Sequence, residues 1–154
     1  MPTTLTRPLV LIADPDVEYA ALIARQLEWA GYGVLTTGDG AEALELIEDK
    51  RPDAVVIEAK MPNMTGYALA RELRERPHTR LIPVVMISAR AGKLDRDFAF
   101  TVGADDYVRK PFRYADLVAR LALLAPAGPQ ITAPLARRPR LRTRRPLAQP
   151  AFAG

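Results

Sequence analysis

Short apolar runs alternate along the chain with segments whose apolar residues recur at helical spacing, and this alternation narrows the possible folds sharply. The first, third and fourth runs are continuously apolar, which is typical of strands covered on both faces in a parallel sheet. The second and fifth are more mixed, as expected for strands at the sheet edges. The runs lie at Leu9–Ala13, Gly33–Thr36, Ala54–Ile57, Ile82–Ile87 and Asp106–Val108.

A helical segment is predicted after each of these runs. The first begins near Asp16, with Leu22 among its inward residues and Trp29 expected to pack near its end. The second opens with Asp39 and Glu42, which have the spacing of a capping box. The others are predicted at 65–74, 93–102 and 114–124.

Five strands alternating with five helices predict an α/β fold. The pattern calls for a parallel sheet with right-handed crossovers and helices on both faces. We therefore predict a flavodoxin-like, doubly wound (βα)5 sheet with strand order 2-1-3-4-5. A chain of about 120 residues can bury roughly two-thirds of its unfolded surface, enough for one independent core. The domain is assigned to residues 1–124.

Residues 125–154 have a different composition and are predicted to form a disordered tail. This stretch holds six prolines and no acidic residue, whereas all 18 acidic residues precede it. Its net charge is +6, against −2 for residues 1–124. The tail could bind nucleic-acid phosphates nonspecifically, or only solubilise the chain. Its arginines are Arg137, Arg138, Arg140, Arg142, Arg144 and Arg145.

Polar side chains lie at the ends of four predicted strands. Asp14 and Asp16 follow the first, Glu58 ends the third, Ser88 ends the fourth and Lys110 follows the fifth. Sites in open parallel sheets form at the carboxyl ends of the strands, so we expect these side chains to meet at one rim. Each alone is typical of a solvated loop, but their coincidence over four strands indicates a site.

The same stretches resemble response-regulator receiver domains over residues 8–124. The matching segments are LVLIADPD at 9–16, PDAVVIEAKMPNMTG at 52–66, IPVVMISA at 82–89 and GADDYVRKPF at 103–112. In such receivers, an aspartate ending the third strand accepts a phosphoryl group. That aspartate and an acid pair after the first strand hold Mg²⁺, while a hydroxyl and a lysine bind the phosphoryl oxygens.

The resemblance assigns four of these roles to residues of this chain. Asp14 corresponds to the first of the acid pair, Ser88 to the hydroxyl, Lys110 to the lysine and Tyr107 to the aromatic residue that reports activation. The peptide bond between Lys110 and Pro111 is expected to be cis.

Two positions depart from the family pattern, and both disfavour conventional phosphorylation. Pro15 stands where the second acid belongs, and Glu58 stands where the acceptor aspartate belongs. Mg²⁺ requires near-octahedral oxygen ligands at about 2.0–2.1 Å, and proline supplies none. Asp16 is expected to cap the first helix, although it could lean toward a cation. Glutamate is one methylene longer, and a carboxylate misplaced by about an ångström costs roughly 10²-fold in rate.

Two interpretations of Glu58 stay open at this point. Its carboxylate could partly mimic a phosphoryl group, carrying one charge against roughly −1.5 to −2, and so bias the receiver toward its active state. Alternatively it forms a structural ion pair with Lys110 or Lys60, which we favour because charge compensation alone suffices. Tyr107 turned inward with Ser88 near Glu58 would indicate an active-like arrangement.

Residues 93–124 resemble the receivers of winged-helix regulators, which form symmetric dimers through this region. The resemblance implies Arg96–Asp116 and Asp106–Arg120 pairs across a two-fold axis. Ordinary solvated charge is the alternative, because a surface ion pair contributes only about 0–1 kcal/mol.

These observations favour a signalling module over an enzyme. The chain has no cysteine, which excludes disulfides and thiolate catalysis and fits a reducing cytoplasm. No signal peptide or membrane-spanning segment is predicted. We predict a cytoplasmic, atypical receiver that needs no cofactor and acts through a histidine kinase, an output protein or a second copy.

Two other functions are weighed against this one. The first is a receiver with residual Mg²⁺-dependent self-phosphorylation, with Asp14 and Asp16 as doubtful metal ligands. The second is a nucleotide-binding enzyme, which is disfavoured because Ala-Asp-Pro-Asp stands at 13–16 in place of a glycine-rich loop.

Overall fold

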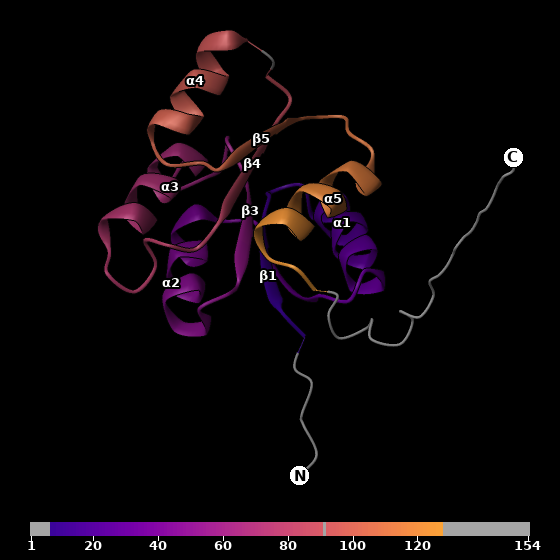
Figure 1. Ribbon diagram of the computed structural model, residues 1–154. Coiled ribbons are helices and arrows are strands. Elements are labelled where there is room, and N and C mark those ends of the chain that lie inside the picture. Colours follow the sequence, from indigo (N-terminus) through magenta and orange to yellow (C-terminus); the bar gives the residue numbers. More distant parts are fainter. Residues whose placement is uncertain (1–6, 91, 128–154) are drawn as a thin grey trace, which may run out of the picture.

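A five-stranded parallel sheet forms the centre of the computed structural model, which describes residues 7–90 and 92–127. The strand order is β2-β1-β3-β4-β5, which confirms the predicted flavodoxin-like topology (Figure 1). The register aligns Ala13 with Ile57 and Glu58 with Ile87, so the strands end close together. The strands are β1 (Leu9–Ala13), β2 (Gly33–Thr37), β3 (Ala54–Glu58), β4 (Val84–Ser88) and β5 (Asp106–Arg109).

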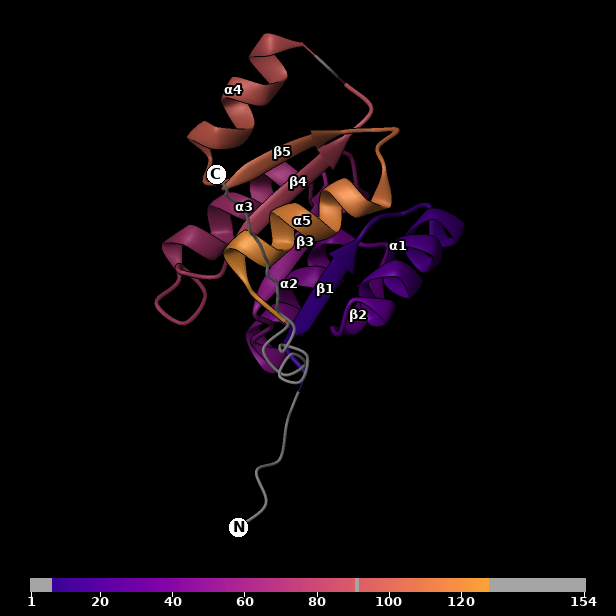
Figure 2. The ribbon, with the colours of Figure 1, turned by 45° about the vertical axis from the view of Figure 1, so that its right-hand side comes forward.

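Helices cover both faces of this sheet. Figures 1 and 2 show α1 and α5 together on one face and α2 and α3 on the other, with α4 beside β5. No helix in the described ranges is long and apolar enough to cross a bilayer. The helices are α1 (Val17–Trp29), α2 (Gly40–Lys50), α3 (Gly66–Glu75), α4 (Lys93–Thr101) and α5 (Tyr114–Leu124).

Two apolar clusters, one on each face of the sheet, form the core. Successive residues of a strand point to opposite faces, so Val10 and Ile12 join α1 and α5 while Leu11 and Ala13 join α2 and α3. Strands β3 and β4 are buried along their whole length. This two-sided burial is why their sequences are continuously apolar.

Side-chain caps fix the starts of the first two helices. Asp16 caps α1 by accepting a hydrogen bond from the Tyr19 amide at 3.0 Å, as predicted. Asp39 caps α2 through the amides of residues 41 and 42, at 2.7 and 3.0 Å. The predicted capping box is only half formed, because the Glu42 carboxylate accepts from the Thr37 hydroxyl instead.

Packing continues past the predicted domain end at residue 124. Ala125 and Ala127 are buried in the cluster beneath α1 and α5. The Tyr32 hydroxyl donates a 2.7 Å hydrogen bond to the Ala125 carbonyl. The folded part therefore extends through residue 127, and the tail arginines lie outside the described residues.

Two expectations about α1 are wrong. Leu22 is 47% exposed and Trp29 is 75% exposed, so neither packs into the core. The buried stripe of the helix instead comprises Ala20, Ile23 and Leu27, spaced three and four residues apart.

Candidate functional site

Four polar side chains converge at the carboxyl ends of the strands, as predicted. Asp14 follows β1, Glu58 ends β3, Ser88 ends β4 and Lys110 follows β5. They line a hollow of about 310 Å³, which we call the rim site. Gly66 lets the start of α3 pack closely against the end of β3, because a Cβ there would lie 2.3 Å from the Glu58 carbonyl oxygen.

Lys110 bridges the two carboxylates of the rim site. Its Nζ lies 2.7 Å from Asp14 Oδ2 and 2.6 Å from Glu58 Oε1. Asp14 is only 2% exposed and Glu58 only 8%, so the ammonium compensates two largely buried negative charges. Burial alone lowers the pKa of Lys110, but the hydrogen bonds to Asp14 and Glu58 outweigh it and raise that pKa above 10.5. Lys110 therefore stays charged at neutral pH.

The remaining carboxylate oxygens are held by backbone amides. Asp14 Oδ1 accepts from the Asp16 amide at 2.9 Å, and Glu58 Oε2 accepts from the Lys60 amide at 3.0 Å. All four oxygens of the two buried carboxylates therefore have partners. Of the two ion pairs predicted for Glu58, the one with Lys110 is present, whereas Lys60 contacts Glu58 through its backbone.

Magnesium is the cation that the resemblance implies here, and the residues present do not fit it. Pro15 offers no carboxylate, and Asp16, which also lines the hollow, uses its Oδ1 to cap α1. In 7–90 and 92–127, no group of three or more histidine, cysteine, aspartate or glutamate side chains is arranged to hold a metal. A divalent ion between Asp14 and Glu58 would have to displace the Lys110 ammonium.

Tyr107 and Ser88 both bond to the backbone of Arg90. Tyr107 lies inward, only 4% exposed, and its hydroxyl donates to the Arg90 carbonyl at 2.8 Å. Ser88 Oγ accepts from the Arg90 amide at 3.0 Å. Arg90 also forms an ion pair with Asp95 of α4, at 3.3 Å. One loop residue thus links both predicted switch residues to a helix.

Tyr19 and Arg90 are site residues that sequence reasoning missed. Lys110 Nζ lies 4.5 Å from the centre of the Tyr19 ring, a cation–π contact that covers one side of the ammonium. Tyr19 could have been found from its position in the first turn of α1, three residues after the capping Asp16. Arg90 acts mainly through its backbone, which no side-chain pattern reveals.

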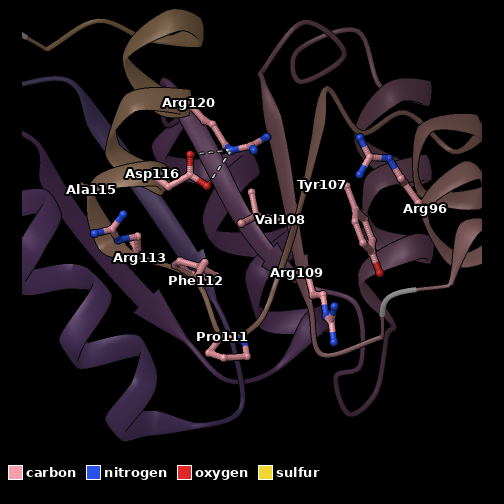
Figure 3. A pocket seen from close by; sticks show the side chains of 10 residues that line it. All are labelled: Arg96, Tyr107, Val108, Arg109, Pro111, Phe112, Arg113, Ala115, Asp116 and Arg120. Atoms are coloured by element: carbon pink, nitrogen blue, oxygen red, sulfur yellow. Dashed lines mark hydrogen bonds and ion pairs between the residues drawn. The ribbon is translucent and has the colours of Figure 1, made fainter.

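The four residues predicted at the dimer face lie on α4, β5 and α5. Figure 3 shows three of them, Arg96, Asp116 and Arg120. Arg120 pairs within the chain, donating to both oxygens of Asp106 at 2.8 and 2.9 Å and contacting Asp116 at 3.3 Å. Hydrogen bonding to Asp106 is the main cause of the raised pKa of the Arg120 guanidinium. Arg96 lies 5.7 Å from the centre of the Phe100 ring. The predicted cis peptide bond between Lys110 and Pro111 is confirmed.

Sequence comparisons identify the family that this chain resembles. A family model for the response regulator receiver domain matches residues 10–122. The transcriptional regulatory protein PrrA of Mycobacterium tuberculosis is 41% identical over 133 residues, covering 86% of this chain and 56% of PrrA. The phosphate regulon transcriptional regulatory protein PhoB of Rhizobium meliloti is 34% identical over 131 residues, covering 84% of this chain and 58% of PhoB. The chain thus spans little more than half of these relatives.

Solved structures show the same fold. A putative response regulator from Chloroflexus aurantiacus aligns with a TM-score of 0.75 and 32% identity, over 78% of this chain and 98% of that one. The receiver domain of the sensor histidine kinase PA1611 from Pseudomonas aeruginosa aligns with a TM-score of 0.73 and 28% identity, over the same shares. The PA1611 structure has a magnesium ion coordinated in its active-site cleft.

Proposed function

This chain belongs to the response regulator receiver domain family of two-component signalling, and we propose that it is an atypical receiver that signals without aspartyl phosphorylation. The observation that carries the proposal is the Lys110 bridge at the rim site. The ammonium of Lys110 is already shared between Asp14 and Glu58 at 2.7 and 2.6 Å. Phosphoryl transfer depends on positioning and charge neutralisation, and here the neutralising cation is already engaged by the carboxylates.

The contrast with PA1611 supports this proposal. That receiver coordinates magnesium in its cleft. Here Pro15 stands where the family pattern has the second acid, and the Asp16 side chain caps α1. Glu58 places a carboxylate against the Lys110 ammonium, so part of the negative charge that a phosphoryl group would add is already present.

Tyr107 and Ser88, the two residues expected to report the switch state, indicate different states. Tyr107 lies inward, as expected for an active-like receiver. The Ser88 hydroxyl, however, bonds to the Arg90 amide rather than to Glu58. We infer that Glu58 supports the structural ion pair with Lys110 and that the inward Tyr107 is held by Arg90, independently of any phosphoryl group.

Acetyl phosphate labelling tests this proposal. Intact-mass measurement of the wild type with acetyl phosphate and Mg²⁺ should show no added phosphoryl group. The double variant Glu58→Asp and Pro15→Asp should gain one, because it restores the acceptor and the second acid beside the retained Lys110 and Ser88. Adding Asp14→Asn to that double variant should remove the label again. Labelling of the wild type would overturn the proposal.

Residual self-phosphorylation is the second candidate function. Asp14, Ser88 and Lys110 all remain at the rim site, and this retention favours it. The predicted acceptor is then Glu58, and the label on the wild type should disappear in Glu58→Gln. Localisation of the label to any other residue would exclude this alternative.

Protein contact through α4, β5 and α5 is the proposed means of signalling. Histidine kinases and output proteins are the proposed partners. The relatives PrrA and PhoB are transcriptional regulatory proteins, which favours an output in transcription. The resemblance to winged-helix regulators adds a symmetric dimer through the same face. Because Arg120 already bonds to Asp106 within the chain, a pair across the two-fold axis would exchange for that bond rather than add to it.

A further inference from the structure

A hollow of about 830 Å³ opens on the face formed by α4, β5 and α5 (Figure 3). Four arginines line it: Arg96, Arg109, Arg113 and Arg120. We call it the arginine-lined hollow. It is separate from the rim site, with which it shares no lining residue. Its volume lies within the range of about 300–1,000 Å³ that is usual for ligand sites.

Three of the four guanidinium groups have no carboxylate within ion-pair distance. Among the residues that the structure describes, Arg96, Arg109 and Arg113 form no salt bridge, whereas Arg120 is fully engaged by Asp106 and Asp116. Figure 3 shows Arg113 and Arg96 on opposite sides of the hollow, with Arg109 between them at its lower edge. Four arginines therefore face two aspartates, and the surface is net positive by two charges.

Apolar side chains form the floor beneath these charges. This floor comprises the exposed Pro111 and Ala115 and the half-buried Phe112. Tyr107 and Val108 of β5 are each only 4% exposed and point into the two core clusters on opposite faces of the sheet. Arginine side chains around an aromatic floor are the composition that protein interfaces favour. The hollow thus offers both anion recognition and apolar contact.

We propose that the arginine-lined hollow binds an acidic segment of another protein, through carboxylates on Arg109 and Arg113 and an apolar side chain on the floor. This rests on the proposed function, because it names the chemistry of the partner that reads this face. Guanidinium groups present paired donors that match carboxylate geometry. Charge complementarity selects a segment rich in aspartate and glutamate with an interspersed apolar residue.

A second copy of the chain would not supply partners for all the arginines of this hollow. In the predicted symmetric dimer, the two aspartates of the face are used by Arg96 and Arg120, and Arg109 and Arg113 stay without partners. Nucleic acid fits less well, because the apolar floor suits a side chain rather than a phosphate backbone.

Residue-resolved binding to a defined peptide tests the proposal. The probe is a twelve-residue synthetic peptide of alternating glutamate and leucine, titrated into the full chain and followed by backbone amide NMR. Shifts should cluster on β5 and on the starts of α4 and α5. The same peptide with glutamine in place of glutamate should not bind, because it lacks the carboxylates.

Two matched double variants separate this site from general electrostatics. Arg109→Glu with Arg113→Glu should weaken peptide binding at least about tenfold, since attraction becomes repulsion. Arg25→Glu with Arg80→Glu makes the same charge change at exposed positions elsewhere and should weaken it less than about twofold. Circular dichroism checks that both variants remain folded.

Several outcomes would overturn the proposal. Equal loss in both double variants, or shifts confined to the tail arginines at 137–145, would mean nonspecific attraction. Tighter binding of a DNA duplex to the same residues would assign the hollow to nucleic acid. None of these readouts involves phosphoryl labelling, so failure here leaves the proposed function to its own test.

Discussion

Lys110 is the only cation in contact with the two buried carboxylates of the rim site within the described ranges. Its side chain is mostly buried, and its ammonium contacts Asp14, Glu58 and the Tyr19 ring. Lys110→Met keeps most of the volume but leaves two buried carboxylates facing each other. We expect it to lower the free energy of unfolding by about 3–5 kcal/mol at neutral pH, measured by urea denaturation. Lys60→Met is the control, because only the backbone amide of Lys60 holds Glu58.

The pH dependence of this difference has a defined sign. The pKa of Lys110 is raised in the folded state, so its stabilising contribution is fully present below the usual lysine value of 10.5. It is lost as the pH rises through the higher folded value. The gap between wild type and Lys110→Met should therefore persist to pH 9 and narrow only in strong alkali. A gap that vanishes at neutral pH would contradict the bridge.

Part of the rim site could be predicted from sequence. The contact between Glu58 and Lys110 followed from two strand ends that a parallel sheet brings together, and the cap at Asp16 followed from an acid before a helix. The bond between Lys110 and Asp14 and the cover by Tyr19 depend on side-chain rotamers. Rotamers depend on packing in three dimensions, so no spacing in the sequence encodes them.

Gly66, which begins α3, fixes the approach of that helix to β3. A Cβ at Gly66 would lie 2.3 Å from the Glu58 carbonyl oxygen and 2.9 Å from the Ala59 Cα, both backbone atoms that cannot yield easily. We expect Gly66→Ala to destabilise the fold by about 2–3 kcal/mol in urea denaturation. Gly33→Ala, whose Cβ would meet nothing closer than 3.7 Å, should change stability by less than about 1 kcal/mol. Equal effects would mean that α3 shifts freely.

Elements were predicted more accurately than their faces and ends. The range of α5 was predicted to the residue, and strands β1 and β3 began where expected. Strand β4 begins at Val84 rather than at Ile82, because Pro83 has no amide to donate and the Ile82 carbonyl is taken by Arg74 at 2.7 Å. The prediction that Leu22 lies in the core was wrong, because the buried stripe of α1 is narrower than the apolar content of the helix suggests.

Tyr32 ties the end of the folded chain to the rest of the molecule. Its buried hydroxyl donates to the Ala125 carbonyl, 93 positions away in sequence. Tyr32→Phe should cost about 1–2 kcal/mol at pH 8, because the carbonyl loses its donor. Burial raises the pKa of Tyr32 above 10.0, so the stabilisation by its neutral form is lost as the pH rises through that folded value. The variant should therefore lose less stability between pH 8 and 11 than the wild type, while Tyr114→Phe should follow the wild type.

At the scale of the whole molecule, the proposed dimer depends on the charges on α4, β5 and α5. Arg120 is the central cation there, bonded to Asp106 and Asp116 within one chain. In a symmetric dimer, its reversal to glutamate sets three carboxylates of one copy against those of the other. We expect Arg120→Glu to weaken dimerisation at least about tenfold in sedimentation equilibrium, and the loss to diminish in high salt.

Arg25→Glu on the exposed side of α1 makes the same change of charge away from this face. It should leave the dimer intact, because exposed charges more than a Debye length of about 8–10 Å apart are largely screened. Unchanged sedimentation of Arg120→Glu, at concentrations where the wild type dimerises, would remove the symmetric dimer. The face would then bind only other proteins and not a second copy of this chain. Arg109 and Arg113 take no part in the predicted dimer pairs, so this result would leave the acidic-segment proposal intact.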